Sequence, residues 1–162
     1  IGRFNGAKAV LSDGADTIGS DLTQSLDLTL GDGADTFSLY DDGIAATGFS
    51  NLRVEGQSVA SYAKITDFTK GEDHVVLGDQ VDALTALTTF VGEAATLEAA
   101  LVNVSSRLAA NDTGVFEYKG STYIYHQDAT VGVNTGDGLI QLVGVTGLTT
   151  GTGAGPFDIH YG

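Results

Sequence analysis

Large apolar residues alternate with polar ones over short stretches in the first half of the chain. The pattern is clearest in SLDLTL (25–30) and FSLY (37–40), where every second residue carries a large apolar side chain. A period of two with one apolar face is typical of a β-strand that packs one side against a core. Because Gly- and Asp-rich segments separate these stretches, residues 1–80 are predicted to form short strands joined by tight turns.

The predicted turns recur at a constant step along the chain. The fragment DGADT occurs twice, and the step between its glycines, Gly14 and Gly33, is 33 − 14 = 19. The step from Gly33 to Gly71, in the related fragment KGEDHVVL, is 71 − 33 = 38, twice as long. Regular spacing of this kind predicts a parallel β-solenoid in which each coil stacks on the previous one. On this interpretation the missing middle coil falls at 52–54, a strand-like segment without the turn residues.

The second half of the chain has a different pattern. A helix is predicted from apolar residues at positions i, i+4, i+7 and i+11, namely Leu97, Leu101, Val104 and Leu108. Thr96 is a suitable N-cap for it. Residues 114–126 read as a β-hairpin, and 139–145 as a strand apolar enough to be central. The upstream segment around 83–94 is ambiguous between a short helix and irregular structure.

These patterns predict a mainly β protein with two parts. Residues 1–80 would form a short parallel β-roll or β-solenoid with a closing segment. Residues 81–162 would form a β-rich C-terminal part with one packed α-helix, and the two parts would pack as one continuous unit. The chain starts without an initiator Met or a signal peptide, so we expect it to be a segment of a longer protein.

Composition narrows the range of partners. The 162 residues include 21 Asp and Glu against 7 Lys and Arg, a formal net charge of −14. Such a surface argues against nucleic acid, because binding to phosphates requires clustered cations. It favours divalent cations that take oxygen ligands. There is no cysteine for a disulfide or a thiolate zinc site, and no apolar run is long enough to span a membrane.

No sequence motif indicates catalysis in this chain. The three histidines lie on separate segments without H-E-x-x-H spacing, and there is no G-x-S-x-G fragment. Carboxylates are so frequent that any single pair is uninformative as a glycosidase dyad. The chain is therefore predicted not to be an enzyme.

The repeated turns have a composition suited to calcium. One Gly-x-Asp turn offers too few oxygens for Ca²⁺, which takes about six to eight. Two turns stacked about 4.8 Å apart can share an ion, which explains why the motif repeats at a constant step. We expect carboxylate ligands from Asp16 and Asp35, with backbone carbonyls from Asp13, Gly14, Asp32 and Gly33. A third turn with Asp67, Gly71 and Asp73 either holds another ion or caps a strand, and plain β-turns remain the alternative throughout.

Three segments resemble proteins of the RTX family. LGDGADTFS (30–38) is similar to the RTX nonapeptide G-G-x-G-x-D-x-U-x, with Leu30 in place of the first glycine. KITDFTKGEDHVVL (64–77) resembles the segment that closes RTX β-rolls. Residues 120–148 are similar to the C-terminal endings of surface proteins exported by type I secretion. The array is short, LSDGADTIG (11–19) matches less well, and the step is longer by one than two consecutive nonapeptides. These departures look more like the S-layer and adhesin branch than the protease or lipase branch.

The resemblance implies a function as well as a fold. It implies a Ca²⁺-filled β-roll, export from a Gram-negative bacterium through the type I secretion machinery, and an uncleaved secretion signal in the C-terminal part. The expected location is extracellular, at the cell surface. The leading hypothesis is a non-enzymatic calcium-binding module of an exported surface protein, with self-assembly of further copies through the edge strands of the roll.

Two alternatives remain open from the sequence. The chain would otherwise be the C-terminal RTX module of a secreted hydrolase whose catalytic residues lie upstream. In the second alternative it is a small carbohydrate-binding domain that uses the tyrosines of the hairpin, Tyr118, Tyr123 and Tyr125.

Overall fold

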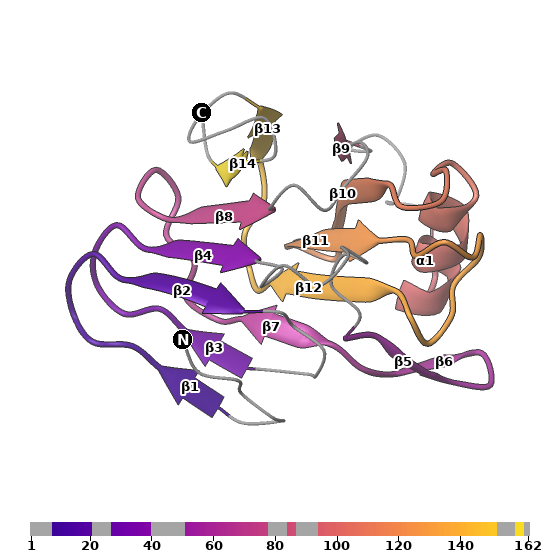
Figure 1. The fold of residues 1–162 in the computed structure, drawn as a ribbon, viewed down its shortest axis with the longest axis horizontal. Helices are drawn as coiled ribbons and strands as arrows, with labels where there is room; N and C mark the ends of the chain where they lie inside the picture. Colours follow the sequence, from indigo (N-terminus) through magenta and orange to yellow (C-terminus); the bar gives the residue numbers. More distant parts are fainter. Residues whose placement is uncertain are drawn as a thin grey trace.

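The computed structural model describes most of the chain as a mainly β protein with one short helix (Figure 1). The described residues are 8–20, 27–39, 51–77, 84–86, 94–151 and 158–160. Among them, two mixed sheets form the body of the molecule, and a separate two-stranded sheet lies beside them. Leu26 and Tyr40, at the ends of two predicted strands, lie outside the described residues.

The strands of the first half alternate between the two main sheets. One sheet contains β1 (Lys8–Val10), β3 (Asp27–Thr29) and β7 (Ala63–Ile65). The other contains β2 (Thr17–Ser20), β4 (Thr36–Leu39) and β8 (His74–Leu77). Neighbours within each of these sets are parallel. The chain therefore alternates between the two sheets. Within each sheet, every new strand lies beside the strand that the chain last contributed to that sheet.

The step seen in the sequence reappears in the register of three of these four parallel pairs. The exception is β3 with β7, where Asp27 pairs with Lys64, an offset of 64 − 27 = 37. Thr17 pairs with Thr36, an offset of 36 − 17 = 19, and Thr36 pairs with His74, an offset of 74 − 36 = 38. In the other sheet Lys8 pairs with Asp27, and the offset is again 27 − 8 = 19. The repeated turns are therefore equivalent positions of successive strand pairs.

The second half of the chain continues both sheets. The first sheet has the order β1-β3-β7-β12-β11-β10-β9, in which the added strands are β9 (Leu84–Ala86), β10 (Thr113–Tyr118), β11 (Ser121–His126) and β12 (Gly138–Leu142). The second sheet gains β14 (Asp158–His160) beside β8, and then β13 (Thr149–Gly151). Each main sheet therefore includes strands from both predicted parts. The segment predicted as a short helix or irregular structure contains the strand β9.

The hairpin predicted at 114–126 is confirmed. β10 and β11 are antiparallel, and Lys119 and Gly120 join them with positive φ angles of 46° and 77°. This is the backbone conformation of a two-residue turn that matches the twist of the flanking strands. The strand predicted at 139–145 is also present as β12, the fourth of seven strands in its sheet.

The prediction that residues 52–54 form a coil of the stack is wrong. β5 (Arg53–Glu55) and β6 (Ser58–Ser61) pair with each other as an antiparallel hairpin in the two-stranded sheet, and β4 lies directly beside β8. Two local causes are visible. Gly56, at φ 65°, provides a tight turn. The Asn51 side chain also exchanges hydrogen bonds with the backbone of Leu139, at 2.8 and 2.9 Å, and so ties the segment to β12.

The predicted helix forms and packs by its apolar stripe. In α1 (Leu97–Ser105) the Thr96 hydroxyl accepts a hydrogen bond from the Ala99 amide at 3.2 Å, so Thr96 is the N-cap. Leu101, Val104 and Leu108 are buried, although the helix ends before Leu108. After the helix the chain continues in tighter turns, in which the amides of Arg107 and Leu108 donate to the carbonyls of Val104 and Ser105, at 3.0 and 3.2 Å.

Two hydrophobic clusters form the core. The first lies between the two main sheets and includes Leu28, Phe37, Ile65, Val75 and Ile140. The second lies between α1 and the strands β10 to β12, and includes Leu101, Phe116, Tyr123, Tyr125 and Leu139. Within the part of the chain that the structure describes, no helix is long and apolar enough to cross a membrane.

Candidate metal-binding site

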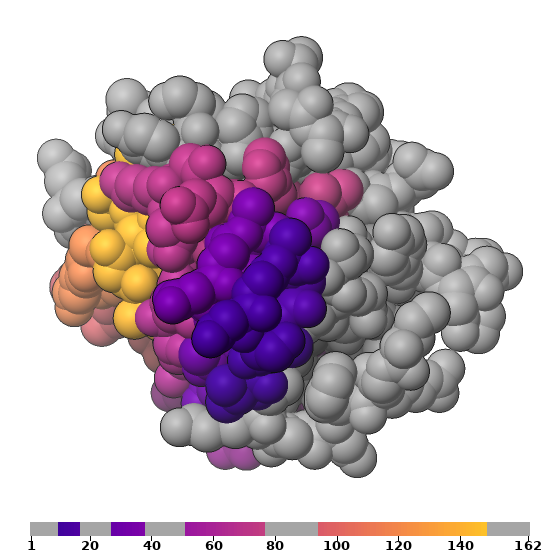
Figure 2. Space-filling view, turned by 90° about the vertical axis from the view of Figure 1, so that its left-hand side faces the viewer, coloured from indigo at the N-terminus to yellow at the C-terminus, as the bar shows by residue number. Residues whose placement is uncertain are grey.

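Three turns lie side by side at one end of the main sheets. Residues 11–16 join β1 to β2, 30–35 join β3 to β4, and 66–73 join β7 to β8 (Figure 1). Figure 2 faces this end and shows the first two turns packed against each other at the surface. These turns contain all of the predicted ligand residues, namely Asp13, Gly14, Asp16, Asp32, Gly33, Asp35, Asp67, Gly71 and Asp73.

The first two turns are in direct backbone contact. The amide of Gly14 donates to the Asp32 carbonyl at 2.6 Å, and the amide of Thr36 donates to the Asp16 carbonyl at 2.8 Å. Gly33 has a φ of 136°, and a Cβ atom added there would lie 2.5 Å from the Gly14 carbonyl oxygen. Glycine is therefore required at position 33 for two reasons, the backbone conformation and the closeness of the neighbouring turn.

The aspartates at the ends of the turns form a ladder. The Oδ1 atom of Asp35 accepts a hydrogen bond from the Asp16 amide at 2.8 Å, and the Oδ1 atom of Asp73 accepts one from the Asp35 amide at 3.0 Å. Each carboxylate therefore bonds to the backbone of the equivalent aspartate in the preceding turn of the three. The sequence predicted that Asp16 and Asp35 would be brought together, and they are neighbours in this ladder.

Asp35 occupies an unusual position in the ladder. The residue is fully buried, and its second carboxylate oxygen, Oδ2, has no hydrogen-bond partner among the described residues. An unsatisfied buried polar atom costs about 1–3 kcal/mol, and more when the group is charged. A cation bound to this oxygen would remove that cost. The site therefore fits a hard cation such as Ca²⁺, which takes carboxylate and carbonyl oxygens.

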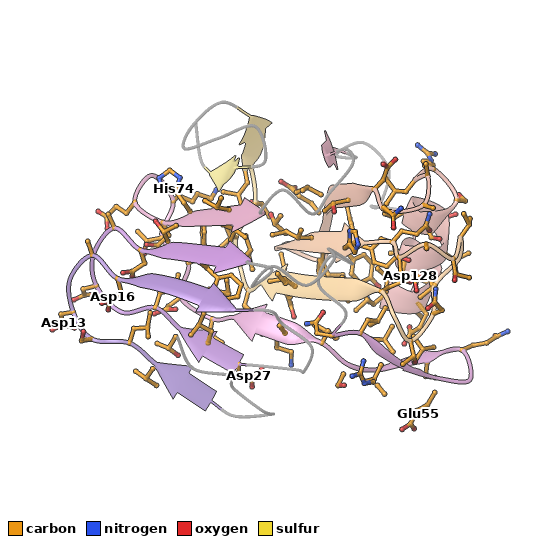
Figure 3. The ribbon with its side chains drawn as sticks, in the orientation of Figure 1. Asp13, Asp16, Asp27, Glu55, His74 and Asp128 are labelled. Carbon is orange, nitrogen blue, oxygen red and sulfur yellow. The ribbon has the colours of Figure 1, made fainter. Side chains whose placement is uncertain are left out.

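Backbone oxygens would have to complete such a site. Within the described segments, no group of three or more Asp, Glu or His side chains converges on one point. Asp13 and Asp32 are exposed at the tips of their turns, and Figure 3 shows Asp13 and Asp16 at this end of the molecule. Two carboxylates and several carbonyls are the ligands that the sequence predicts for the first two turns, and this set stays a prediction.

Asp67 is already engaged by the backbone of the neighbouring turn. Its two carboxylate oxygens accept hydrogen bonds from the amides of Leu30 and Gly31, at 2.8 and 2.9 Å. Gly71 has the expected positive φ of 83°, but nothing in the described structure lies within 4 Å of a Cβ added there. The third turn thus lies against the second and repeats two of its contacts, because Asp73 accepts the Asp35 amide and the His74 amide donates to the Asp35 carbonyl at 2.8 Å. It does not repeat the close approach seen at Gly33.

The sequence missed one polar residue of the first turn. The Ser12 hydroxyl donates to the Oδ2 atom of Asp16 at 3.3 Å. Ser12 stands where the RTX nonapeptide has a glycine, so it enters the sequence comparison only as a departure from the motif. The departure itself is the signal, because a serine four residues before an aspartate can reach its carboxylate across a tight turn.

Asp137 is the centre of a second acidic site, at the opposite end of the molecule. It is fully buried, and it accepts hydrogen bonds from the Tyr125 hydroxyl at 2.6 Å and from the amides of Asp128 and Asn134 at 3.0 and 2.9 Å. Figure 3 shows Asp128 far from Asp13 and Asp16. The geometry gives Asp137 a structural role, because protein donors surround its carboxylate.

The hairpin tyrosines do not form an exposed surface for a sugar. Tyr118, Tyr123 and Tyr125 are 6%, 5% and 0% exposed. Tyr123 stacks on Phe116 with ring centroids 5.4 Å apart, as expected for core aromatic residues. The carbohydrate-binding alternative therefore has no support from these residues.

The chain was compared with known proteins. No family model and no curated protein matches it. The functional assignment therefore depends on the geometry of the turns.

Burial of Asp137 predicts a specific pH dependence. Burial raises the pKa of Asp137 above its usual value of 3.8, and it outweighs the hydrogen bonds from Asp128, Tyr125 and Asn134, which lower that pKa. The folded state therefore binds this proton more tightly than the unfolded state does. The contribution of Asp137 to the free energy of unfolding should fall as the pH rises from about 3.8 through the raised pKa.

Comparison with the Asp137→Asn variant isolates this group, because asparagine does not titrate. We expect the free energy of unfolding of the wild type, relative to the variant, to decrease between pH 3.5 and pH 7. Urea unfolding in the presence of EGTA at several pH values measures it. If the free energy of unfolding of the wild type, relative to the variant, increases with pH, the hydrogen bonds lower the pKa of Asp137 instead.

Proposed function

We propose that this chain is a calcium-stabilised, non-enzymatic module with a short β-roll. The roll would consist of three successive two-strand units, namely β1 with β2, β3 with β4, and β7 with β8, with one strand of each unit in each main sheet. The observation that carries the proposal is the buried carboxylate of Asp35, whose Oδ2 atom has no hydrogen-bond partner in the described part of the chain. The roll is supported by the parallel pairing of β2 with β4, at an offset of 19 residues, and of β4 with β8, at an offset of 38. The backbone contact between the first two turns supports a shared ion.

Calcium would be held between the turns 11–16 and 30–35. The proposed ligands are the carboxylates of Asp16 and Asp35, with carbonyls drawn from Asp13, Gly14, Asp32 and Gly33. When bound, the ion supplies positive charge to a chain whose formal net charge is −14. Two acidic turns that would otherwise repel each other are thereby fixed in register.

The same chemistry suits an exported protein. Ca²⁺ sites of roughly 0.1–1 mM affinity are typical of extracellular modules, and such sites fill only where calcium is abundant. We propose that the module is exported by type I secretion to the bacterial cell surface and that calcium binding completes its folding there. The strands β1 and β2 are the edges of their sheets in the described structure, and so provide surfaces for assembly with further copies.

Thermal unfolding with and without calcium tests the proposal. A ligand that binds only the folded state adds RT ln(1 + [L]/Kd), which for 10 mM Ca²⁺ and the affinity above is about 1.4–2.7 kcal/mol. For a chain of this length we expect the melting temperature to rise by about 3–10 °C. Circular dichroism in EGTA, in 10 mM CaCl₂ and in 10 mM MgCl₂ measures it.

A pair of variants locates the effect. Asp35→Asn should abolish the calcium-induced rise, because the amide binds the cation poorly. Asp27→Asn is the matched control, since Asp27 lies at the other end of β3, far from the turns (Figure 3), and it should retain the rise. A wild-type melting temperature that is the same in EGTA and in calcium would refute the proposed function.

A further inference from the structure

We propose that the turn 66–73 closes the stack with its own carboxylates and takes no cation, so that the metal site is confined to the turns 11–16 and 30–35. This inference rests on the proposed function and narrows it. It also resolves the alternative left open by the sequence for Asp67 and Asp73, in favour of structural acceptors.

The Asp67 carboxylate accepts a hydrogen bond that a backbone carbonyl accepts at the equivalent position between the first two turns. Between the first two coils, the amide of Leu11 donates to the carbonyl of Thr29 at 3.0 Å. The equivalent amide one coil later belongs to Leu30, and it donates to the Asp67 carboxylate. The other oxygen of Asp67 takes the adjacent amide of Gly31. A carboxylate that receives both amides forms charge-assisted hydrogen bonds and has its negative charge compensated by the chain itself.

Asp73 occupies the same ladder position as Asp35 but is satisfied differently. Both residues are buried, at 1% and 0% exposure. Asp73 accepts the Asp35 amide on Oδ1 and the Thr69 amide on Oδ2, at 3.0 and 2.7 Å. Asp35 accepts the Asp16 amide on Oδ1, and its Oδ2 atom is unpaired within the described residues. The Thr69 amide is available to Asp73 because the turn 66–73 is longer than the other two and folds back on itself.

The backbone contacts of the glycines differ in the same way. Gly33 lies so close to the first turn that an added Cβ would meet the Gly14 carbonyl oxygen at 2.5 Å, whereas one added at Gly71 would meet no described atom within 4 Å. The close approach of two turns at a glycine is therefore present between 11–16 and 30–35. It is not repeated at Gly71.

The test compares Asp67→Asn with Asp35→Asn in the full chain, by melting temperature and by calorimetric titration with CaCl₂. Asp67→Asn removes one of the two acceptors and should lower the melting temperature equally in EGTA and in calcium, with the Kd for Ca²⁺ changed less than twofold. Asp35→Asn should leave the melting temperature in EGTA unchanged or raised, since it neutralises an unpaired buried charge, and should abolish the calcium response.

Each outcome has a distinct meaning. A tenfold or greater loss of calcium affinity in Asp67→Asn would overturn the inference and leave the proposed function standing. If Asp67→Asn does not fold, Asp73→Asn replaces it, with the same expectation and the same criterion. A wild type that does not respond to calcium would overturn the proposed function and the inference together.

Discussion

Replacing Gly33 with alanine is expected to lower the free energy of unfolding by about 2–5 kcal/mol, whereas Gly14→Ala should cost about 1–2 kcal/mol. Both glycines have φ angles that disfavour other residues, 136° and 121°, and this strain costs about 1–2 kcal/mol at each. Only at position 33 would the new methyl group also collide with backbone, at 2.5 Å from the Gly14 carbonyl oxygen. Forcing the two turns apart adds about 1–3 kcal/mol.

Urea unfolding of both variants in saturating CaCl₂ measures this difference. The Gly14 variant is the matched control, because it changes the equivalent position of the same type of turn. No described atom lies within 4 Å of a Cβ atom added at Gly14. The Gly33 variant should also bind calcium more weakly, since it separates the two turns that are proposed to share the ion. Equal destabilisation of the two variants would mean that the turns do not stack as described.

The stacking of the turns was predictable because it depends on distance along the chain. A constant step between identical turns places equivalent residues side by side whenever the strands between them are parallel. The step from Gly14 to Gly33 accordingly became the register of Thr17 with Thr36. The helix and the hairpin were predictable for a similar reason, because their patterns are local.

The closing segment was not predictable from the same step. Extrapolating that step beyond Gly33 leads to 52–54, but Gly56 and Asn51 give that segment its own hairpin and its own attachment to Leu139. Local turn chemistry and one pair of long-range hydrogen bonds thus override the period. A periodic pattern fixes where a coil would lie and does not require the chain to form one there.

The hydrogen-bond partners of the individual aspartates were also hidden from the sequence. Asp35, Asp67 and Asp73 all follow a turn or lie within one, and each was predicted as a ligand. What separates them is the number of amides that reach the carboxylate, and for Asp67 those amides belong to residues 36 and 37 positions earlier. Such donors are set by tertiary packing, so residue type and spacing alone cannot distinguish a metal ligand from a structural acceptor.

The second large effect is expected at the opposite end of the molecule, where Asp137 holds a loop closed. Its carboxylate is fully buried and accepts hydrogen bonds from the Tyr125 hydroxyl and from the amides of Asp128 and Asn134. The Asn134 side chain adds a further, longer contact at 3.3 Å. Truncation to alanine would leave the buried Tyr125 hydroxyl and the two part-buried amides without their acceptor, at about 1–3 kcal/mol for each unsatisfied buried group.

Asp137→Ala is therefore expected to lower the free energy of unfolding by about 3–5 kcal/mol, and to do so equally in EGTA and in calcium. Asp128→Ala is the matched control in the same loop, because Asp128 is only half-buried and accepts mainly from the Thr130 amide; it should cost about 1 kcal/mol. Urea unfolding of both variants measures the difference. If the loss in Asp137→Ala is confined to calcium-containing buffer, then Asp137 is a cation ligand and its structural role is refuted. A loss independent of calcium would separate this end of the chain from the proposed metal site.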